Sequence, residues 1–223
     1  VKDRIVQQAL KQILEPIFEE VFLPQSFGYR SGKGALGAVE RVRRYVQLFG
    51  YRGAADMDIK GFFDNVDHEI LLRLVNEKVS DGRILGLIRL FLESGAMEEG
   101  KYSSTDFGTP QGGVISPLLS NIYLHEVLDV WFEREVVPRL KGRAELIRFA
   151  DDFVIVFSHE ADAHRVAEVL PKRFDRFGLT IHDTKTRLID FRRPGGRDSK
   201  PEVFEFLGFS HYWGKSRRGV WVV

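Results

Sequence analysis

Two adjacent aspartates, Asp151 and Asp152, lie between two apolar segments of the chain. The flanking residues, 146–149 and 153–158, are rich in β-branched and aromatic side chains, which is typical of two strands joined by a tight turn. Strands this apolar need at least one covered face, so we expect the carboxylates at the tip of a buried hairpin. Carboxylates held there need a positive partner, and a divalent cation is the natural candidate. The alternative is an ordinary turn, because aspartate favours turns by itself.

A third aspartate, Asp58, belongs to another segment with strand periodicity. Apolar and polar residues alternate from Ala55 to Lys60. In a β-α-β-β-α-β order this strand can lie next to the hairpin, which would bring Asp58 opposite Asp151 and Asp152. Three carboxylates in one small space repel each other unless cations lie between them. Two divalent ions about 3.5–4 Å apart are the usual arrangement for in-line attack at phosphorus.

Hydrophobic periodicity predicts the elements that must position these aspartates. Helical spacing covers residues 1–22 (with a kink or a break at Pro16), 35–49, 68–78, 82–93, 116–131 and 159–177. Strand-like patterns cover 179–191, 203–210 and 219–223. The sequence therefore predicts an α+β fold, with a mostly antiparallel sheet and helices on one of its faces.

Composition narrows the classes of function. The chain has 223 residues, of which 43% are hydrophobic, enough for a sizeable core. It has no cysteine, which excludes disulfide scaffolds, thiolate zinc sites and cysteine nucleophiles. No apolar run is long enough to span a bilayer, and we expect no membrane partner. The formal net charge is only +1, so nucleic-acid binding would depend on local basic patches.

Two basic segments could form such patches. Arg30 and Lys33 lie among glycines and aromatic residues in a loop over 23–36, which suits contact with phosphates and bases. An ordinary solvated connection explains the same pattern equally well. Arg41, Arg43 and Arg44 follow in the next helical segment, where they form either a solvated face or a face toward nucleic acid.

Three long motifs resemble reverse transcriptases of the bacterial group II intron type. They are Asp58–His68, Thr109–Leu124 and Phe149–Asp152, in the order of that family, and shorter segments at 26–30, 178–179, 185–186 and 206–209 support them. The resemblance extends over nearly the whole chain. Two features depart from it: Phe149 stands where the family usually has tyrosine, and His182-Asp183 where it more often has asparagine and glutamate.

The resemblance implies a metal site. Asp58 and Asp151 would hold two Mg²⁺ ions, with Mn²⁺ as a substitute, and Asp152 would complete the acidic cluster less directly. Ile59 would belong to both the metal site and the nucleotide site. Lys185 would approach the pyrophosphate and protonate it.

The resemblance also implies a deoxynucleotide site. Gly61 and Phe62 would offer backbone N–H groups to the triphosphate, and Phe63 would lie under the sugar and exclude a 2′-hydroxyl. Gln111 would contact the nucleotide or the template. Gly112 would permit close approach of the backbone.

Template and primer contacts follow from the same family. Arg30 and Lys33 are the candidate contacts to the RNA template. Phe206, Leu207 and Gly208 resemble the segment that holds the 3′ end of the DNA primer.

The resemblance divides the chain into the parts of a fingers–palm fragment. We expect truncated fingers over 1–53, palm over 54–65, a fingers–palm connection over 66–115, and palm to primer grip over 116–223, with the thumb absent. The implied activity is RNA-directed DNA synthesis from deoxynucleoside triphosphates, in the cytoplasm of a bacterium or in an organelle-derived host. Cognate intron RNA is a further expected partner, and truncation would expose apolar surface for self-association.

Two other functions remain open at this point. The chain could be an RNA-binding maturase module whose isolated fragment is catalytically inactive, since RNA binding does not need the carboxylates. An RNA-templated RNA polymerase is disfavoured by Phe63, whose ring would exclude ribonucleotides.

Overall fold

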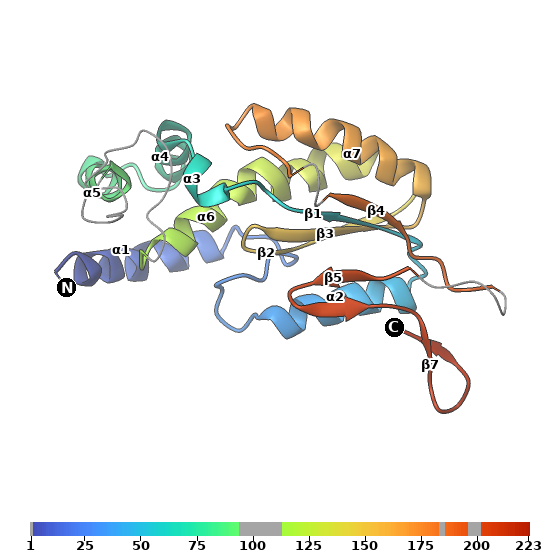
Figure 1. Cartoon of the computed structure of the whole chain (residues 1–223). Helices are drawn as coiled ribbons and strands as arrows, with labels where there is room; N and C mark the ends of the chain where they lie inside the picture. The colour runs from blue at the N-terminus through green and yellow to red at the C-terminus, as the bar shows by residue number, and fades with distance from the viewer. Residues whose placement is uncertain (1, 94–112, 183–185, 196–201) are drawn as a thin grey trace.

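A four-stranded antiparallel sheet forms the centre of the computed structural model (Figure 1). The structure describes residues 2–93, 113–182, 186–195 and 202–223. The strands are β1 (Gly53–Met57), β2 (Ala144–Phe149), β3 (Asp152–Phe157) and β4 (Arg187–Asp190), in the spatial order β2-β3-β1-β4. Every neighbouring pair is antiparallel. With helices between β1 and β2 and between β3 and β4, this confirms the predicted β-α-β-β-α-β arrangement.

Helices form most of the rest of the described chain. They are α1 (Lys2–Glu19), α2 (Ala35–Gln47), α3 (Phe62–Asn65), α4 (His68–Asn76), α5 (Gly82–Glu93), α6 (Ser116–Leu124) and α7 (Glu160–Asp175). The helix α6 continues into π-helical turns, η1 (His125–Val130) and η2 (Phe132–Val136), and a 3₁₀ turn, η3 (Val137–Arg139), beyond the predicted end. None of the helices described is long and apolar enough to cross a bilayer.

Pro16 does not divide the first helix, which runs on to Glu19. Leu14 and Phe18, on either side of this proline, are both buried in the main core. Packing of these two side chains holds the helical turn that carries Pro16.

The two faces of the sheet are covered differently. The main core lies on the face that carries Met57 and Phe153, under α6 and α7 (Figure 1). The second core lies on the face that carries Val154 and Val156, under α2 and under the hairpin of β5 (Phe204–Phe206) and β6 (Phe209–His211). The prediction of helices on one face was therefore incomplete, because β3 is apolar on both faces and both must be covered.

The C-terminal segments form two short hairpins instead of isolated strands. The predicted strand over 203–210 is a hairpin that turns at Leu207 and Gly208, with φ angles of 54° and 76°. Two consecutive positive φ angles are typical of a two-residue hairpin turn whose twist matches its strands. The last strand, β8 (Trp221–Val222), pairs with β7 (Gly214–Lys215).

Phe174→Ala should strongly lower the free energy of unfolding. Phe174 lies on α7, is fully buried, and its ring centroid is 6.2 Å from that of Phe153 on β3. Loss of a buried phenyl ring leaves a cavity, which costs about 3–5 kcal/mol. Val169→Ala on the exposed side of the same helix should cost only about 0.5 kcal/mol. Urea unfolding measures both, and equal losses would contradict the packing of α7 on this sheet.

Candidate active site

The two principal acidic residues of the motifs lie at the same end of the sheet. Asp58 follows β1 directly, and Asp151 lies in the turn between β2 and β3. Because Met57 on β1 lies opposite Phe153 on β3, Asp58 comes next to that turn. Asp151 is half-buried, and burial followed by the negative charge of Asp58 raises its pKa. The structure therefore brings Asp58 and Asp151 together, as the strand order predicts.

The turn that carries Asp151 has an unusual backbone conformation. Ala150 is buried and has a φ of 57°, a left-handed conformation that alanine rarely adopts. Its carbonyl oxygen accepts a hydrogen bond of 2.8 Å from Nη1 of Arg148. Asp152 is exposed at the start of β3. The turn thus directs its two aspartates differently, one half-buried beside Asp58 and one toward solvent.

Asp58 and Asp151 are the two carboxylates that the structure places together at the candidate metal site, and the part of Asp152 in the acidic cluster stays a prediction. In residues 2–93, 113–182, 186–195 and 202–223, no three histidine, aspartate or glutamate side chains are grouped so that they could hold one ion. Mg²⁺ usually binds one or two protein carboxylates and takes its other oxygens from substrate phosphates and water. Asp58 and Asp151 fit that pattern. The side chain of Ile59 is apolar and buried, so only its backbone could contribute to the metal site.

Asp56 belongs to the same acidic group, although the motif analysis did not select it. It is half-buried on β1, two residues before Asp58 and therefore on the same side of the strand. Burial raises its pKa to about 6, and the charges of Asp152, Asp58 and Glu205 add to this effect, whereas Arg187 opposes it. The alternating pattern of β1 was the sequence signal that could have identified it.

The segment at 180–182 holds the end of β1 in place. The backbone N–H of His182 donates to the carbonyl oxygen of Asp58 at 2.8 Å, and that of Lys60 donates to Thr180 at 2.8 Å. Ile59 and Ile181 form a bridge between these two bonds. The chain just before Lys185 therefore runs beside Asp58. Lys185, Gln111 and Gly112 themselves lie outside the described residues.

The residues after Asp58 form a tight turn that hydrogen bonds hold in place. Gly61 has a φ of 53°, a conformation that favours glycine, and Asn65 donates its side-chain amide to the carbonyl of Gly61 at 2.8 Å. The side chain of Phe62 is buried in the main core. Phe63 is only half-buried, with its ring edge-on to Phe62. The buried ring fixes the position of its partly exposed neighbour.

Arg30 and Lys33, the two predicted template contacts, form hydrogen bonds within the protein itself. Arg30 is only 8% exposed, and its guanidinium donates to Glu19 and to the carbonyls of Leu23 and Ser26. Lys33 donates to Ser26 and to a second backbone carbonyl, and burial followed by the charge of Arg30 lowers its pKa to about 8. Both cations hold the loop together, so their placement does not support a direct template contact.

The arginines of α2 differ from one another. Arg41 pairs with Glu145, and Arg43 pairs with Glu40 on the same helix. Arg44 lies over the ring of Phe49, with 5.7 Å between its guanidinium carbon and the ring centroid. The exposed pair of Arg43 favours a solvated, neutralised face, whereas the part-buried pair of Arg41 links α2 to β2.

The predicted primer-binding residues lie on the β5–β6 hairpin. Phe206 is buried in the second core, whereas Leu207 and Gly208 form the turn of the hairpin. The strand β5 lies against β1 and β3 (Figure 1). Glu205 on this strand is close enough to Asp56 to raise its pKa. The hairpin thus extends along the sheet to the acidic group.

Comparisons with known proteins agree with the motifs. A family model described as Reverse transcriptase (RNA-dependent DNA polymerase) matches residues 1–211. The group II intron-encoded protein LtrA of Lactococcus lactis subsp. cremoris is 42% identical over 144 residues, which cover 62% of this chain and 24% of that protein. Nuclear intron maturase 2, a mitochondrial protein of Arabidopsis thaliana, is 28% identical over 235 residues, which cover 87% of this chain and 30% of that protein.

A solved structure shows the same fold. A telomerase from Candida tropicalis, in complex with a TWJ fragment of telomeric RNA, has a TM-score of 0.63 at 15% identity. The match covers 89% of this chain and 35% of the telomerase chain. This chain therefore spans well under half the length of each of these relatives.

Asp56→Asn should stabilise the protein increasingly as the pH rises from about 4 to 6. The pKa of Asp56 in the folded protein is about 6 instead of 3.8, so the folded state keeps its proton more strongly than the unfolded state. This carboxyl therefore costs stability as pH rises through that interval, and asparagine removes the cost. The measurement is the difference in Tm between variant and natural chain across this range, in magnesium-free buffer.

Asp190→Asn is the matched control, and its change in stability with pH should have the opposite sign. A hydrogen bond from Arg192 lowers the pKa of Asp190, so this variant should lose stability relative to the natural chain as pH rises. A flat profile for Asp56→Asn would contradict the burial of Asp56 among other acids.

Proposed function

Because this chain belongs to the reverse transcriptase (RNA-dependent DNA polymerase) family, we propose that it forms the fingers and palm of an enzyme that copies RNA into DNA. The proposal rests on one observation: Asp58 at the end of β1 lies next to Asp151 in the turn between β2 and β3. Within this proposal, fingers cover 1–53, palm covers 54–65 and 116–223, and 66–115 connect them. The reaction joins a primer 3′-hydroxyl to the α-phosphate of a deoxynucleotide and releases pyrophosphate.

Asp58 and Asp151 would hold two Mg²⁺ ions, or Mn²⁺ in their place, together with triphosphate oxygens. When bound, such ions lower the pKa of the attacking hydroxyl and neutralise the leaving oxygens. Burial is the main cause of the raised pKa of Asp151, and the negative charge of Asp58 adds to it, so the two carboxylates also repel each other. A cation between them relieves that repulsion, which supports a site whose affinity comes partly from the bound substrate.

The deoxynucleotide would lie over the turn that follows Asp58. The backbone of Gly61 and Phe62 would face the triphosphate, and the half-buried ring of Phe63 would lie under the sugar. Gln111, Gly112 and Lys185 keep their predicted roles beside the nucleotide and the pyrophosphate. The hydrogen bonds of this turn and the contact of Phe63 with the buried ring of Phe62 support this function, because selection between sugars depends on a ring that is held in place.

The primer end would be held by the turn at Leu207 and Gly208. This turn belongs to a hairpin that lies against β1 and β3, the strands next to the catalytic carboxylates. Phe206 would anchor the hairpin through its burial in the second core.

We further propose that the enzyme belongs to an intron-encoded system. The relative LtrA is named as a group II intron-encoded protein and the Arabidopsis relative as an intron maturase. Intron RNA is therefore a second RNA partner to test besides the template. A cytoplasmic location in a bacterial host is part of this proposal, and the bacterial relative supports it.

Asp58→Asn and Asp151→Asn should each abolish DNA synthesis while leaving RNA binding intact. Loss of one carboxylate removes several kcal/mol of charge stabilisation, which corresponds to about three orders of magnitude in rate. Primer extension on poly(rA)/oligo(dT) with Mg²⁺ measures the synthesis, and filter binding measures RNA affinity. Asp175→Asn, at the exposed end of α7, is the matched control and should be fully active. Unchanged synthesis in both variants would contradict the proposed metal site, whereas RNA binding without any synthesis by the natural chain would favour a module that only binds RNA.

Phe63→Val should admit ribonucleotides. If the ring excludes the 2′-hydroxyl, the shorter side chain should raise kcat/KM for ribonucleotides relative to deoxynucleotides by at least about tenfold. Single-nucleotide incorporation with matched dNTP and rNTP measures this ratio. Phe49→Val removes another partly exposed ring, at the end of α2, and should leave the ratio unchanged. An unchanged ratio in Phe63→Val would contradict the proposed position of the sugar.

A further inference from the structure

A loop from the N-terminal part of the chain lies directly against the turn that carries Asp151. A Cβ atom added at Gly28 would lie 2.3 Å from the backbone nitrogen of Ala150 and 3.0 Å from its Cα. Real Cβ atoms do not approach backbone so closely, so this position requires glycine. The contact is made to the residue whose left-handed conformation directs Asp151.

The same loop extends the edge of the sheet. Ser26 forms a parallel bridge with Arg148 on the edge strand β2. The backbone N–H of Phe27 donates to the carbonyl of Arg148 at 2.8 Å, and the N–H of Arg148 donates to Gln25 at 3.0 Å. The segment from Gln25 to Gly28 is therefore fixed to the strand that leads into the turn.

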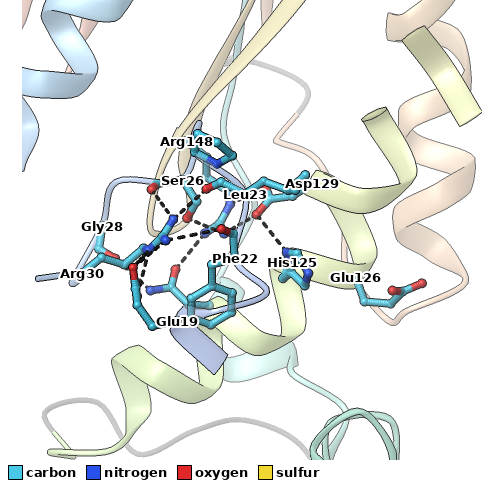
Figure 2. Close-up of polar contacts among 12 residues, drawn as sticks. Glu19, Phe22, Leu23, Ser26, Gly28, Arg30, His125, Glu126, Asp129 and Arg148 are labelled. Atoms are coloured by element: carbon cyan, nitrogen blue, oxygen red, sulfur yellow. Dashed lines mark hydrogen bonds and ion pairs between the residues drawn. The ribbon is translucent and has the colours of Figure 1, made fainter. Parts of the chain in front are cut away.

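The side chain of Arg148 contacts this loop, the turn between β2 and β3, and the helix formed by α6 and its continuation η1 (Figure 2). It is fully buried, and its guanidinium donates to both carboxylate oxygens of Asp129 on η1, at 2.8 and 2.6 Å. It also donates to the carbonyl of Ala150, to the side-chain oxygen of Asn121 and to the hydroxyl of Ser26. Asn121 in turn donates to the carbonyl of Gly28 at 2.8 Å. One arginine thus connects three separate elements around the turn.

Electrostatic attraction holds this cluster together. Burial alone would raise the pKa of Asp129, but the charge and hydrogen bonds of Arg148 hold it below its usual value. Both members of the pair are fully buried, so separating them would leave a charge without water or a partner. The pair therefore resists separation, and the same guanidinium donates a hydrogen bond to the carbonyl of Ala150.

We propose that Gly28 and Arg148 are positioning residues that set where the carboxylate of Asp151 lies for metal binding and catalysis. The inference rests on the proposed function, since it assigns these two residues to the same site. The loop at 23–30 would then affect catalysis through the position of Asp151, without contact between the substrate and either Gly28 or Arg148.

The test compares Gly28→Ala, Arg148→Lys and Ser26→Ala with Gly142→Ala. A Cβ at Gly142 would also be too close to its neighbours, 2.6 Å from Oγ of Ser158, but at the end of the same hairpin far from Asp151. Arg148→Lys keeps a positive charge for Asp129 and loses the fork of hydrogen bonds. Ser26→Ala removes one hydrogen bond and serves as the mild variant, should Gly28→Ala fail to fold.

Two properties are measured at a temperature where each variant is folded. The first is the affinity for Mn²⁺ alone, by water proton relaxation. The second is primer extension, separated into kcat and the KM for deoxynucleotide. We expect Gly28→Ala and Arg148→Lys to weaken Mn²⁺ binding and to lower kcat by about tenfold or more, with a smaller loss in Ser26→Ala. Gly142→Ala should lower only the Tm.

Two outcomes separate this inference from the proposed function. If Asp151→Asn abolishes synthesis but the three variants lose only Tm, as Gly142→Ala does, the positioning role is overturned and the polymerase stands. If Asp151→Asn retains full synthesis, the proposed function itself fails. Weakened Mn²⁺ binding in Arg148→Lys at normal KM supports the positioning role.

Discussion

The buried ion pair between Arg148 and Asp129 is the interaction on which the arrangement of this molecule depends. It lies where the edge strand β2, the helix that follows α6 and the loop at 23–30 meet (Figure 2). Such a pair contributes little net stability, because removing two charges from water costs about as much as their attraction returns. Its effect is on geometry: separating the pair would leave a buried charge without a partner, and the same arginine donates to the carbonyl of Ala150 in the turn before Asp151.

The packing of the main core and the acidic residues involve different parts of the sheet. One face is filled by the main core under α6 and α7, which fixes the strands. The other face is covered by α2 and the β5–β6 hairpin, and the acidic residues lie at its end. Antiparallel pairing of β1 with β3 places Asp58 and Asp151 side by side, although 93 residues separate them in the chain. The paired strands hold these acids in place despite their repulsion, and in the proposed function a cation or a substrate would relieve it.

Strand alternation and helical spacing predicted most elements, because both patterns follow directly from which side chains are buried. They could not predict the turn at Leu207, since apolar residues continue through it and only the φ angles reveal it. The family motifs predicted the meeting of Asp58 and Asp151. They assigned Arg30 to the template, whereas its partner Glu19 lies eleven residues away on α1, beyond any local pattern. The sequence does show a charged residue, Arg148, within an apolar strand, which indicates a buried ion pair, but nothing in the spacing identified Asp129 as its partner.

Anomalous diffraction from crystals soaked with Mn²⁺ and a deoxynucleoside triphosphate would test the central claim most directly, which is that Asp58 and Asp151 form one metal site. The account predicts anomalous density between these two carboxylates, lost in Asp58→Asn and retained in Asp175→Asn. Density that persists without Asp58, or that lies away from both residues, would contradict the assignment of this end of the sheet as the catalytic centre.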